Sequence, residues 1–497
     1  MNQLATRSTV SIGRAASLTR TTKVVSRVPM GIAVLAIALL AAILSLVPVA
    51  LVVVTLVALS VFVLVAMRPV FAAYLLLFLG PLLSGIDRGA AIPFLRPTEA
   101  VAALVGLGLL GRGIIVVLAS GSPRFRPSRM DAAVIVLAIA GSIGPFLWML
   151  ARGVEVGSDD IAYGLLLWKF AAIYFIFRTC VKTERQVRIC LWIAMLAGAA
   201  VSVIAILQAL GFAPVVAFIS GHFAPYGNTE AVVNNRGGAT LGLPIAAADL
   251  LTYDLAIAAG FLLSAKAMFT NAANRRLVIL VLMGLFAAGI IASGEFSALI
   301  GLVIAIVVLA VVSRRAALVL YLLPGLCIGL YVLKPVIEHR LAGFQSTTGL
   351  PVSWTGRLYN LRNYFWPELF SHDRFILGVR LAARVIVPTQ ATGYVWIESG
   401  YTWLLWSGGI PFLIAFVWFA YVGIRRGVAV ARSRTDAIGV AGLASAAGLS
   451  VVSVLMVLDP HLTYRGAADL LFALLAMATI ARVRTSTKGS IRSSSRA

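Results

Sequence analysis

The sequence predicts an all-α membrane protein: a polytopic helical bundle of about 14 transmembrane helices with one large outer loop. Of its 497 residues, 61% are hydrophobic and only 12% are charged, and the apolar residues come in long uninterrupted blocks. A block of about 20 apolar residues is long enough to cross a bilayer. The net charge of +23 comes mainly from Lys and Arg in short links between the blocks. That distribution indicates membrane topology rather than a nucleic-acid partner.

The apolar blocks set the expected spans. They lie near residues 29–47, 49–67, 69–85, 98–118, 131–150, 160–178, 187–211, 244–265, 276–293, 296–313, 316–333, 396–424, 437–458 and 466–482. The first two join at Pro48 and together are too long for the apolar region of a signal peptide, so we expect them to be retained.

The links between blocks predict the organisation of the chain. Inner links such as "SPRFRPSR" and "RRGVAVARSR" are basic, whereas acids gather in segments such as "EVGSDD" and "GNTE". This bias places both termini inside. The expected parts are a basic cytoplasmic tail (1–28), N-terminal transmembrane helices (29–211), a first outer loop (212–243), central transmembrane helices (244–333), a large periplasmic or extracellular loop (334–395), C-terminal transmembrane helices (396–482) and a basic cytoplasmic tail (483–497).

Cysteine and histidine spacings favour neither a disulfide framework nor a metal site. The cysteines, none in a CxxC pair, are Cys180, Cys190 and Cys327. The histidines fall in expected outer segments, where the alternative to an isolated solvated residue, which we expect, is a proton-transfer group: His222, His339, His372 and His461. We therefore expect no metal and no other cofactor.

The large outer loop contains "SWTGRLYNLRNYFWPELF", which predicts a short amphipathic helix. Leu358, Leu361 and Phe365 recur at helical spacing, and Pro367 is expected to end the run. The segment also carries two arginines that suit phosphates or lipid headgroups and four aromatic residues that suit sugar stacking: Arg357, Arg362, Trp354, Tyr359, Tyr364 and Trp366. The alternative is an interfacial anchor with an aromatic belt and no ligand.

Several charged residues lie within or beside expected spans. Arg236, in "NNRGGATLGLPIAAADLL", either binds an anion bidentately or is a snorkelling border residue. Asp249 and Asp254 follow inside a span and should face the bundle or a wet cavity, because ionisable groups are costly at depth. Three others need no functional explanation: Lys169 is expected to snorkel, Glu295 to lie exposed at a tight outer turn, and Arg112 to lie in a weak span.

The stretch "WIESGYTWLLWSGGIP" places a carboxylate, Glu398, at the mouth of an apolar and aromatic run. It is either an interfacial residue or a general base whose pKa is raised by partial burial. Its position directly after the Arg-rich and aromatic-rich loop favours the second interpretation.

Residues 230–425 resemble the O-antigen ligase and polymerase superfamily, membrane glycosyltransferases that act on lipid-linked oligosaccharides. The matching segments are "NNRGGATLGL", "SGEFSALIGLVIAIVVLAVVSRR", "HRLAGF", "GRLYNLRNYFWPELF" and "ESGYTWLLWSGGIPFL". The resemblance implies a location in the bacterial cytoplasmic membrane and pyrophosphate binding by Arg236, Arg340 and Arg357. It also implies that the substrates are undecaprenyl-pyrophosphate-linked repeats. The implied partners are membrane lipids, a flippase and a chain-length regulator.

Two positions depart from the ligase pattern. Glu398 stands where ligases carry His, which favours a repeat-unit polymerase over a ligase. Glu295 stands where a Ser-Arg pair is usual, which removes an expected cation. The resulting hypothesis is a metal-independent glycosyltransferase in which Arg236, Arg340 and Arg357 bind pyrophosphate, Glu398 is the base, and Trp354, Tyr359 and Trp366 stack on sugars. The alternatives are a ligase that uses a lipid or protein acceptor, and a secondary transporter or flippase for a lipid-linked or anionic solute.

Overall fold

The computed structural model describes residues 49–90, 95–120, 127–223, 236–264, 272–342, 344, 351–388 and 393–480. The expected span at 29–47 and both expected tails lie outside these residues. Within them the chain is predominantly helical, as predicted, and its sheet is a two-stranded hairpin. Eight of the described helices are long and apolar enough to cross a membrane, fewer than the expected number of about 14.

The chain divides into two compact units. The first comprises residues 1–69 and 104–125, and its described elements are α3 (Val49–Met67) and the later turns of α5 (Pro97–Ser120). Arg112 of α5 donates hydrogen bonds to the carbonyl oxygens of Ala66 and Met67 at 2.9 and 3.3 Å. Carbonyls in the last turn of a helix have no partner within it, so Arg112 caps α3.

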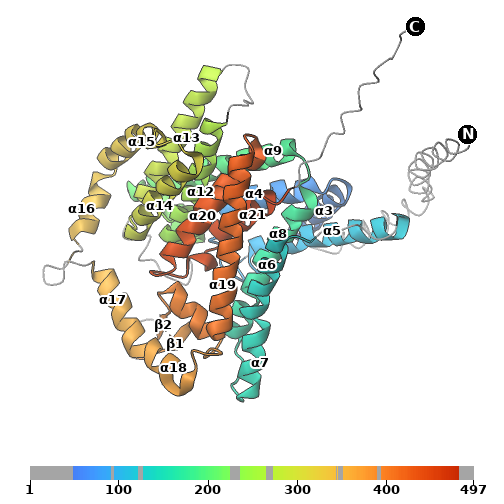
Figure 1. Ribbon diagram of the computed structural model, residues 1–497, viewed down its shortest axis with the longest axis vertical. Coiled ribbons are helices and arrows are strands. Elements are labelled where there is room, and N and C mark those ends of the chain that lie inside the picture. The colour runs from blue at the N-terminus through green and yellow to red at the C-terminus, as the bar shows by residue number, and fades with distance from the viewer. Residues whose placement is uncertain are drawn as a thin grey trace, which may run out of the picture. The chain divides into compact units, whose positions relative to one another are not determined.

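The second unit comprises residues 70–103 and 126–497. Its bundle helices are α4 (Val70–Leu83), α6 (Arg129–Ala140), α7 (Ile143–Ala151), α8 (Ser158–Cys180), α9 (Glu184–Ala209), α10 (Ala213–His222), α12 (Pro244–Leu263), α13 (Ala272–Ala292), α14 (Phe296–Ser313), α15 (Leu318–Val332), α19 (Gly400–Ser433), α20 (Ala437–Leu455) and α21 (Ala467–Met477). Helices α12 and α20 form its centre (Figure 1), because nearly all their residues are buried against α9, α13, α14, α19 and α21. Two 3-10 turns, η3 (Ala239–Leu241) and η6 (His461–Thr463), join these helices.

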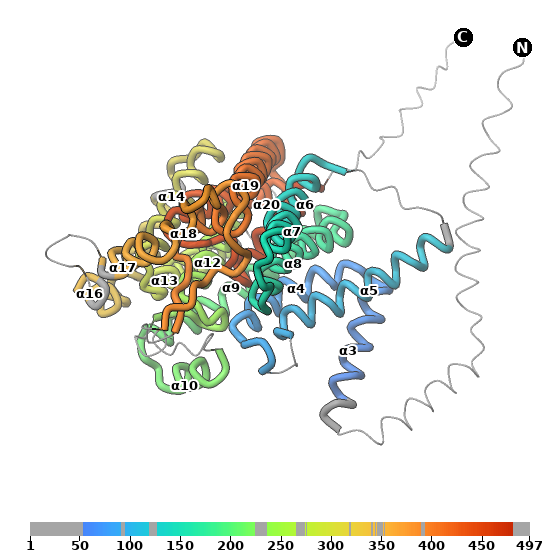
Figure 2. The backbone as a smooth tube through the Cα atoms, turned by 90° about the horizontal axis from the view of Figure 1, so that it is seen from below, coloured from blue at the N-terminus to red at the C-terminus, as the bar shows by residue number. Residues whose placement is uncertain are grey.

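The large outer loop is mostly structured. It contains α16 (Lys334–Ala342), α17 (Val352–Asn360), a π-helical turn η4 (Leu361–Phe365), α18 (Trp366–Phe370), a 3-10 turn η5 (Ser371–Asp373), and the antiparallel strands β1 (Arg384–Ile386) and β2 (Tyr394–Trp396). Figures 1 and 2 show α17 and α18 beside one end of α19.

The expected amphipathic helix is present, with two differences. Leu361 and Phe365 are buried within the protein, but Leu358 is 39% exposed. The prediction that Pro367 ends the helix is wrong, because Pro367 lies in the first turn of α18 and the chain stays helical to Phe370. A proline is tolerated there, since the first N–H groups of a helix have no partner within it.

Helix α19 is broken at the glycine pair of the "WSGGIP" motif. Gly409 has φ 64° and ψ −157°, a conformation that only glycine adopts without strain. The loop between η5 and β1 lies against the break: Ile410 N–H donates to the Ile376 carbonyl at 3.0 Å, and Val379 N–H donates to the Trp406 carbonyl at 2.6 Å. The expected span at 396–424 therefore consists of two helical arms. At the break between them, backbone groups of the outer loop form the hydrogen bonds.

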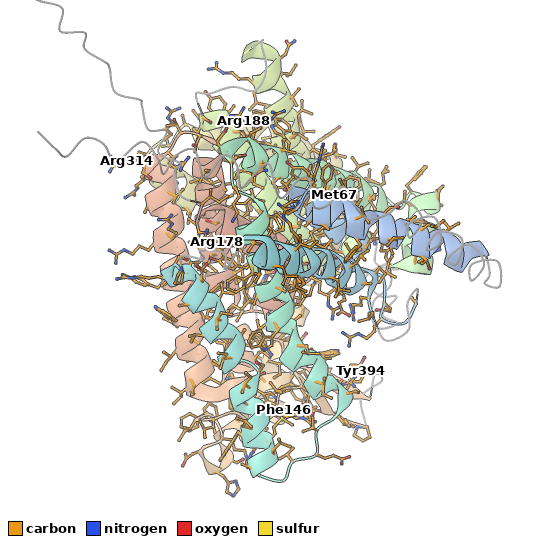
Figure 3. All side chains as sticks on the ribbon, turned by 90° about the vertical axis from the view of Figure 1, so that its right-hand side faces the viewer. Met67, Phe146, Arg178, Arg188, Arg314 and Tyr394 are labelled. Atoms are coloured by element: carbon orange, nitrogen blue, oxygen red, sulfur yellow. The ribbon has the colours of Figure 1, made fainter. Side chains whose placement is uncertain are left out.

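The ends of the second unit differ in character. Figure 3 places Arg188 and Arg314 toward one end, and Phe146 and Tyr394 toward the other. Both arginines belong to links expected inside the cell, whereas Tyr394 belongs to the large outer loop. The expected links thus lie at opposite ends, and the assignment of those ends to the two faces of a membrane stays a prediction.

Candidate functional site

The candidate site forms where the outer loop enters α19. Ser399 is the N-cap of this helix, and its hydroxyl accepts a hydrogen bond from Thr402 N–H at 3.4 Å. Ile397 N–H donates to the carbonyl of Ala383, the residue directly before β1, at 3.0 Å and ties this segment to it. Glu398 lies between these two fixed residues. Its backbone is therefore fixed directly before the first turn of α19.

Arg357 of α17 joins two carboxylates from different parts of the chain. Its Nη2 atom lies 2.7 Å from an Asp459 carboxylate oxygen, and its Nε atom lies 3.7 Å from Oε1 of Glu398. Nη1 also donates to the Leu458 carbonyl at 3.4 Å. Asp459 follows α20, so one guanidinium connects the outer loop, the entry to α19 and the link between α20 and α21.

Asn360 and Tyr464 complete this cluster, which we call the Arg357 cluster: Arg357, Asn360, Glu398, Asp459 and Tyr464. Asn360 lies three residues after Arg357, on the same side of α17, and donates to Oε2 of Glu398 at 3.2 Å. The Tyr464 hydroxyl is hydrogen-bonded to Asp459. Burial, followed by the charge of Asp459, raises the pKa of Tyr464 well above its usual value. Tyr464 therefore stays a neutral hydrogen-bond donor.

The pKa of Glu398 is raised above its usual value. Burial is the largest cause, the charge of Asp459 adds to it, and Arg357 and the Asn360 hydrogen bond act in the opposite direction. Burial lowers the pKa of Arg357, but the charges of Asp459 and Glu398 outweigh it and raise that pKa overall. The cluster thus holds a permanent cation beside a carboxylate whose pKa lies above that of an exposed glutamate.

Arg357 is not an unoccupied anion site. With both carboxylates ionised, the cluster has one positive and two negative charges, so an anionic ligand would compete with Glu398 and Asp459 for the guanidinium. Protonation of Glu398 removes one of these competitors.

A second polar pair is buried within the bundle. His461 and Asp249 are 1% and 2% exposed, and Nδ1 of His461 lies 2.7 Å from a carboxylate oxygen of Asp249. The expectation that His461 is a solvated loop residue is therefore wrong. Asp249 does face the bundle interior, as predicted, and so does Asp254, which is fully buried against Gly198 of α9.

Two other charged residues differ from expectation. Lys169 does not snorkel; it pairs with Asp469 of α21 at 2.9 Å, and both side chains are largely buried. Glu295 is not exposed at its turn, because its side chain is 12% exposed and forms an ion pair with Arg236. Arg236 thus meets an acid of its own chain at the position where the resemblance implies a pyrophosphate.

The remaining predicted residues lie in the outer loop. Arg340 belongs to α16, and its side chain lies outside the described residues. Trp354 is half-buried and lies one helical turn before Arg357, whereas Tyr359 is 58% exposed on another side of α17. Trp366 is half-buried, and its Nε1 donates to the Thr402 hydroxyl at 3.3 Å, near the entry to α19.

Sequence reasoning missed Asn360, Asp459 and Tyr464. The signal available was "LDPHLTYRG", where an acid, a histidine, a tyrosine and an arginine crowd between two apolar blocks. Within the described residues, no group of three or more His, Cys, Asp or Glu side chains is arranged to hold a metal ion. Comparison of the chain with models of known protein families and with curated proteins gives no match.

Proposed function

We propose that this protein is a membrane glycosyltransferase that polymerises undecaprenyl-pyrophosphate-linked oligosaccharide repeats at the outer face of the cytoplasmic membrane. The observation that carries the proposal is the Arg357 cluster, in which a permanent cation and a carboxylate of raised pKa meet at the mouth of an apolar helix. A lipid-linked sugar needs such a place, because its carrier chain stays in the bilayer while its pyrophosphate and sugars lie at the surface.

The proposed reaction is a single displacement. Glu398 accepts the proton of an acceptor hydroxyl, whose oxygen forms the new bond to the anomeric carbon of the donor glycan. The bond from that carbon to the pyrophosphate oxygen breaks, and the pyrophosphate leaves with the electron pair. Arg357 stabilises the departing anion by charge-assisted hydrogen bonding. When Glu398 gains the proton, it stops competing for Arg357, so proton transfer and anion binding support each other.

A test replaces one residue of each type. Glu398→Gln keeps the shape of the side chain but cannot take a proton at working pH, and Arg357→Ala removes the cation. In the native host, we expect both variants to abolish long glycans and leave single repeats on gels, with the protein still inserted. Glu338→Gln is the matched control, because Glu338 is an exposed acid of α16 that pairs with Lys334 one turn before it. Normal long chains in both site variants would refute the proposal.

Polymerase and ligase differ in their acceptor. We expect purified protein to convert lipid-linked repeats into longer lipid-linked chains without any other acceptor. Elongation only after a lipid or protein acceptor is added would favour the ligase alternative.

A secondary transporter or flippase is the second candidate. The buried pairs Lys169–Asp469 and Asp249–His461, together with Asp254, favour it, because ionisable groups inside a bundle often mark a transport path. In proteoliposomes, movement of a labelled lipid-linked sugar between leaflets without elongation would support this candidate. Elongation without movement would support the polymerase.

A further inference from the structure

A row of side chains on β2 leads directly to Glu398. Tyr394, Trp396 and Glu398 are each partly exposed, whereas the residues between them are buried: Val395 is 6% exposed and Ile397 is 2% exposed. Alternate residues of an extended chain point to the same face. The two aromatic side chains therefore lie on the same face as the carboxylate.

Two neighbouring elements enlarge this face. Arg384 of β1 pairs with Trp396 across the hairpin, and its guanidinium carbon lies 5.1 Å from the ring centre of Tyr394 and 5.7 Å from that of Trp396. Tyr163 of α8 contributes a third ring, whose centre lies 6.4 Å from that of Trp396. We call these four residues, Tyr163, Arg384, Tyr394 and Trp396, the hairpin platform.

Ion pairs and hydrogen bonds attach the hairpin platform to α8. Arg384 forms an ion pair with Asp159 at the start of α8. Just before β1, Arg380 donates to the next residue of α8, Asp160, at 2.6 and 3.2 Å, and Ala382 N–H donates to the same buried carboxylate at 2.8 Å. These contacts fix the position of the hairpin relative to α8. Arg384 also lies against the Tyr394 and Trp396 rings, which stay partly exposed.

From this arrangement we infer that the hairpin platform binds the acceptor sugar. A pyranose has an apolar C–H face that packs on an aromatic ring, and its hydroxyls bond to charged groups at the rim. Arg384 and Asp159 supply a donor and an acceptor of hydrogen bonds at that rim. Only the role of the bound sugar as the acceptor rests on the proposed function, because carbohydrate binding can be measured by itself.

The position of the hairpin platform favours the acceptor over the donor. Trp396 lies two residues from Glu398, a separation of about 7 Å along an extended chain. Arg357 approaches the same carboxylate from α17, a different element. The base therefore has an aromatic face beside it on its own strand segment and a cation beside it on α17, which suits an acceptor hydroxyl at the first and a leaving pyrophosphate at the second.

Binding to the full-length purified protein tests the inference. The probe is a set of soluble one-repeat and two-repeat oligosaccharides released from the host's own surface polysaccharide, and the measurement is saturation-transfer NMR. We expect Trp396→Ala and Tyr394→Ala each to weaken binding roughly 2- to 10-fold, the range expected for one aromatic contact. Trp396→Phe should keep most of the affinity.

Tyr421→Ala is the matched control. Tyr421 is a 57% exposed ring of α19 that also lies under an arginine, with the Arg425 guanidinium carbon 5.9 Å from its centre, but it has no carboxylate of the candidate site nearby in the chain. This variant should bind the oligosaccharides as the wild type does. Equal binding by the wild type, Trp396→Ala and Tyr394→Ala would overturn the inference.

The same samples separate the two proposals. Glu398→Gln should still bind the oligosaccharides while losing elongation. If the wild type binds them through Trp396 but elongates nothing, the polymerase proposal falls and the sugar site stands. If the wild type elongates, and Trp396→Ala elongates with an unchanged acceptor KM, the sugar site falls and the polymerase proposal stands.

Discussion

At the scale of single residues, the proposed chemistry depends on how neighbours set the charge of Glu398. Its carboxylate is partly buried, with Arg357, Asn360 and Asp459 around it. Burial and Asp459 disfavour the ionised form, whereas Arg357 and Asn360 favour it. The first pair prevails, so the pKa lies above the value of about 4.3 that is usual for glutamate.

This direction predicts the pH dependence of activity. A general base works only when ionised, so elongation by the wild type should fall as pH drops through the pKa of Glu398. Because that pKa is raised, the fall should occur at a higher pH than an exposed glutamate would give. The measurement is the elongation rate of purified protein across pH at saturating substrate.

Two substitutions beside Glu398 should move the acid limb of the pH–rate profile, the pH range in which elongation falls, in opposite directions. Asp459→Asn removes a negative charge that raises the pKa of Glu398, so the acid limb should move to lower pH. Asn360→Ala removes a hydrogen bond that stabilises the carboxylate, so the limb should move to higher pH. A limb that stays in place in both variants would show that another group controls it.

At the scale of elements, the break in α19 matters most. The arm after the break, residues 410–433, is about 36 Å long at 1.5 Å per residue, which exceeds the roughly 30 Å thickness of the hydrocarbon core of a bilayer. The arm before it, residues 400–408, is free to pack with the outer loop: Phe365 meets Trp406 at 5.2 Å between ring centres, and Trp406 Nε1 donates to the Ala382 carbonyl at 3.0 Å. The break thereby holds Glu398 against α17.

Gly409→Ala should destabilise the protein and reduce elongation. An added Cβ would meet the Ile376 carbonyl, and the positive φ of Gly409 is strained for any other residue. Strain of this type costs on the order of 1–3 kcal/mol. We expect a lower unfolding temperature in detergent. Gly144→Ala is the control, because a Cβ at Gly144 of α7 has open space, and an unfolding temperature equally low in both variants would contradict this account.

At the scale of the whole molecule, sidedness is the property to test. Cysteines introduced at two exposed positions report it: Ser353 in the outer loop, and Ala316 beside the basic link "SRR". In spheroplasts, a membrane-impermeant maleimide should label Ser353→Cys directly and Ala316→Cys only after permeabilisation. Removal of the exposed native thiol, Cys327, is needed first. Direct labelling of both positions would contradict the predicted topology.

The apolar blocks could be predicted from the sequence because a helix and its hydrophobicity are local properties. Most described helices from residue 49 onward accordingly coincide with the expected apolar blocks, although α10 lies in a segment expected to be a loop and the block at 131–150 forms two helices, α6 and α7. Glu398 could be proposed as a candidate from the sequence, since a carboxylate beside a long apolar run is conspicuous in a chain so poor in acids.

Only the tertiary structure decided which charges meet. His461 and Asp249 are 212 residues apart in the chain, and Arg236 and Glu295 are 59 apart, yet each pair is in contact. Hydropathy shows that a buried charge needs a partner but does not name it, because the partner depends on how helices pack. The packing of the outer loop against the broken α19 places Asp459 beside Arg357. The same packing forms the aromatic row that leads to Glu398.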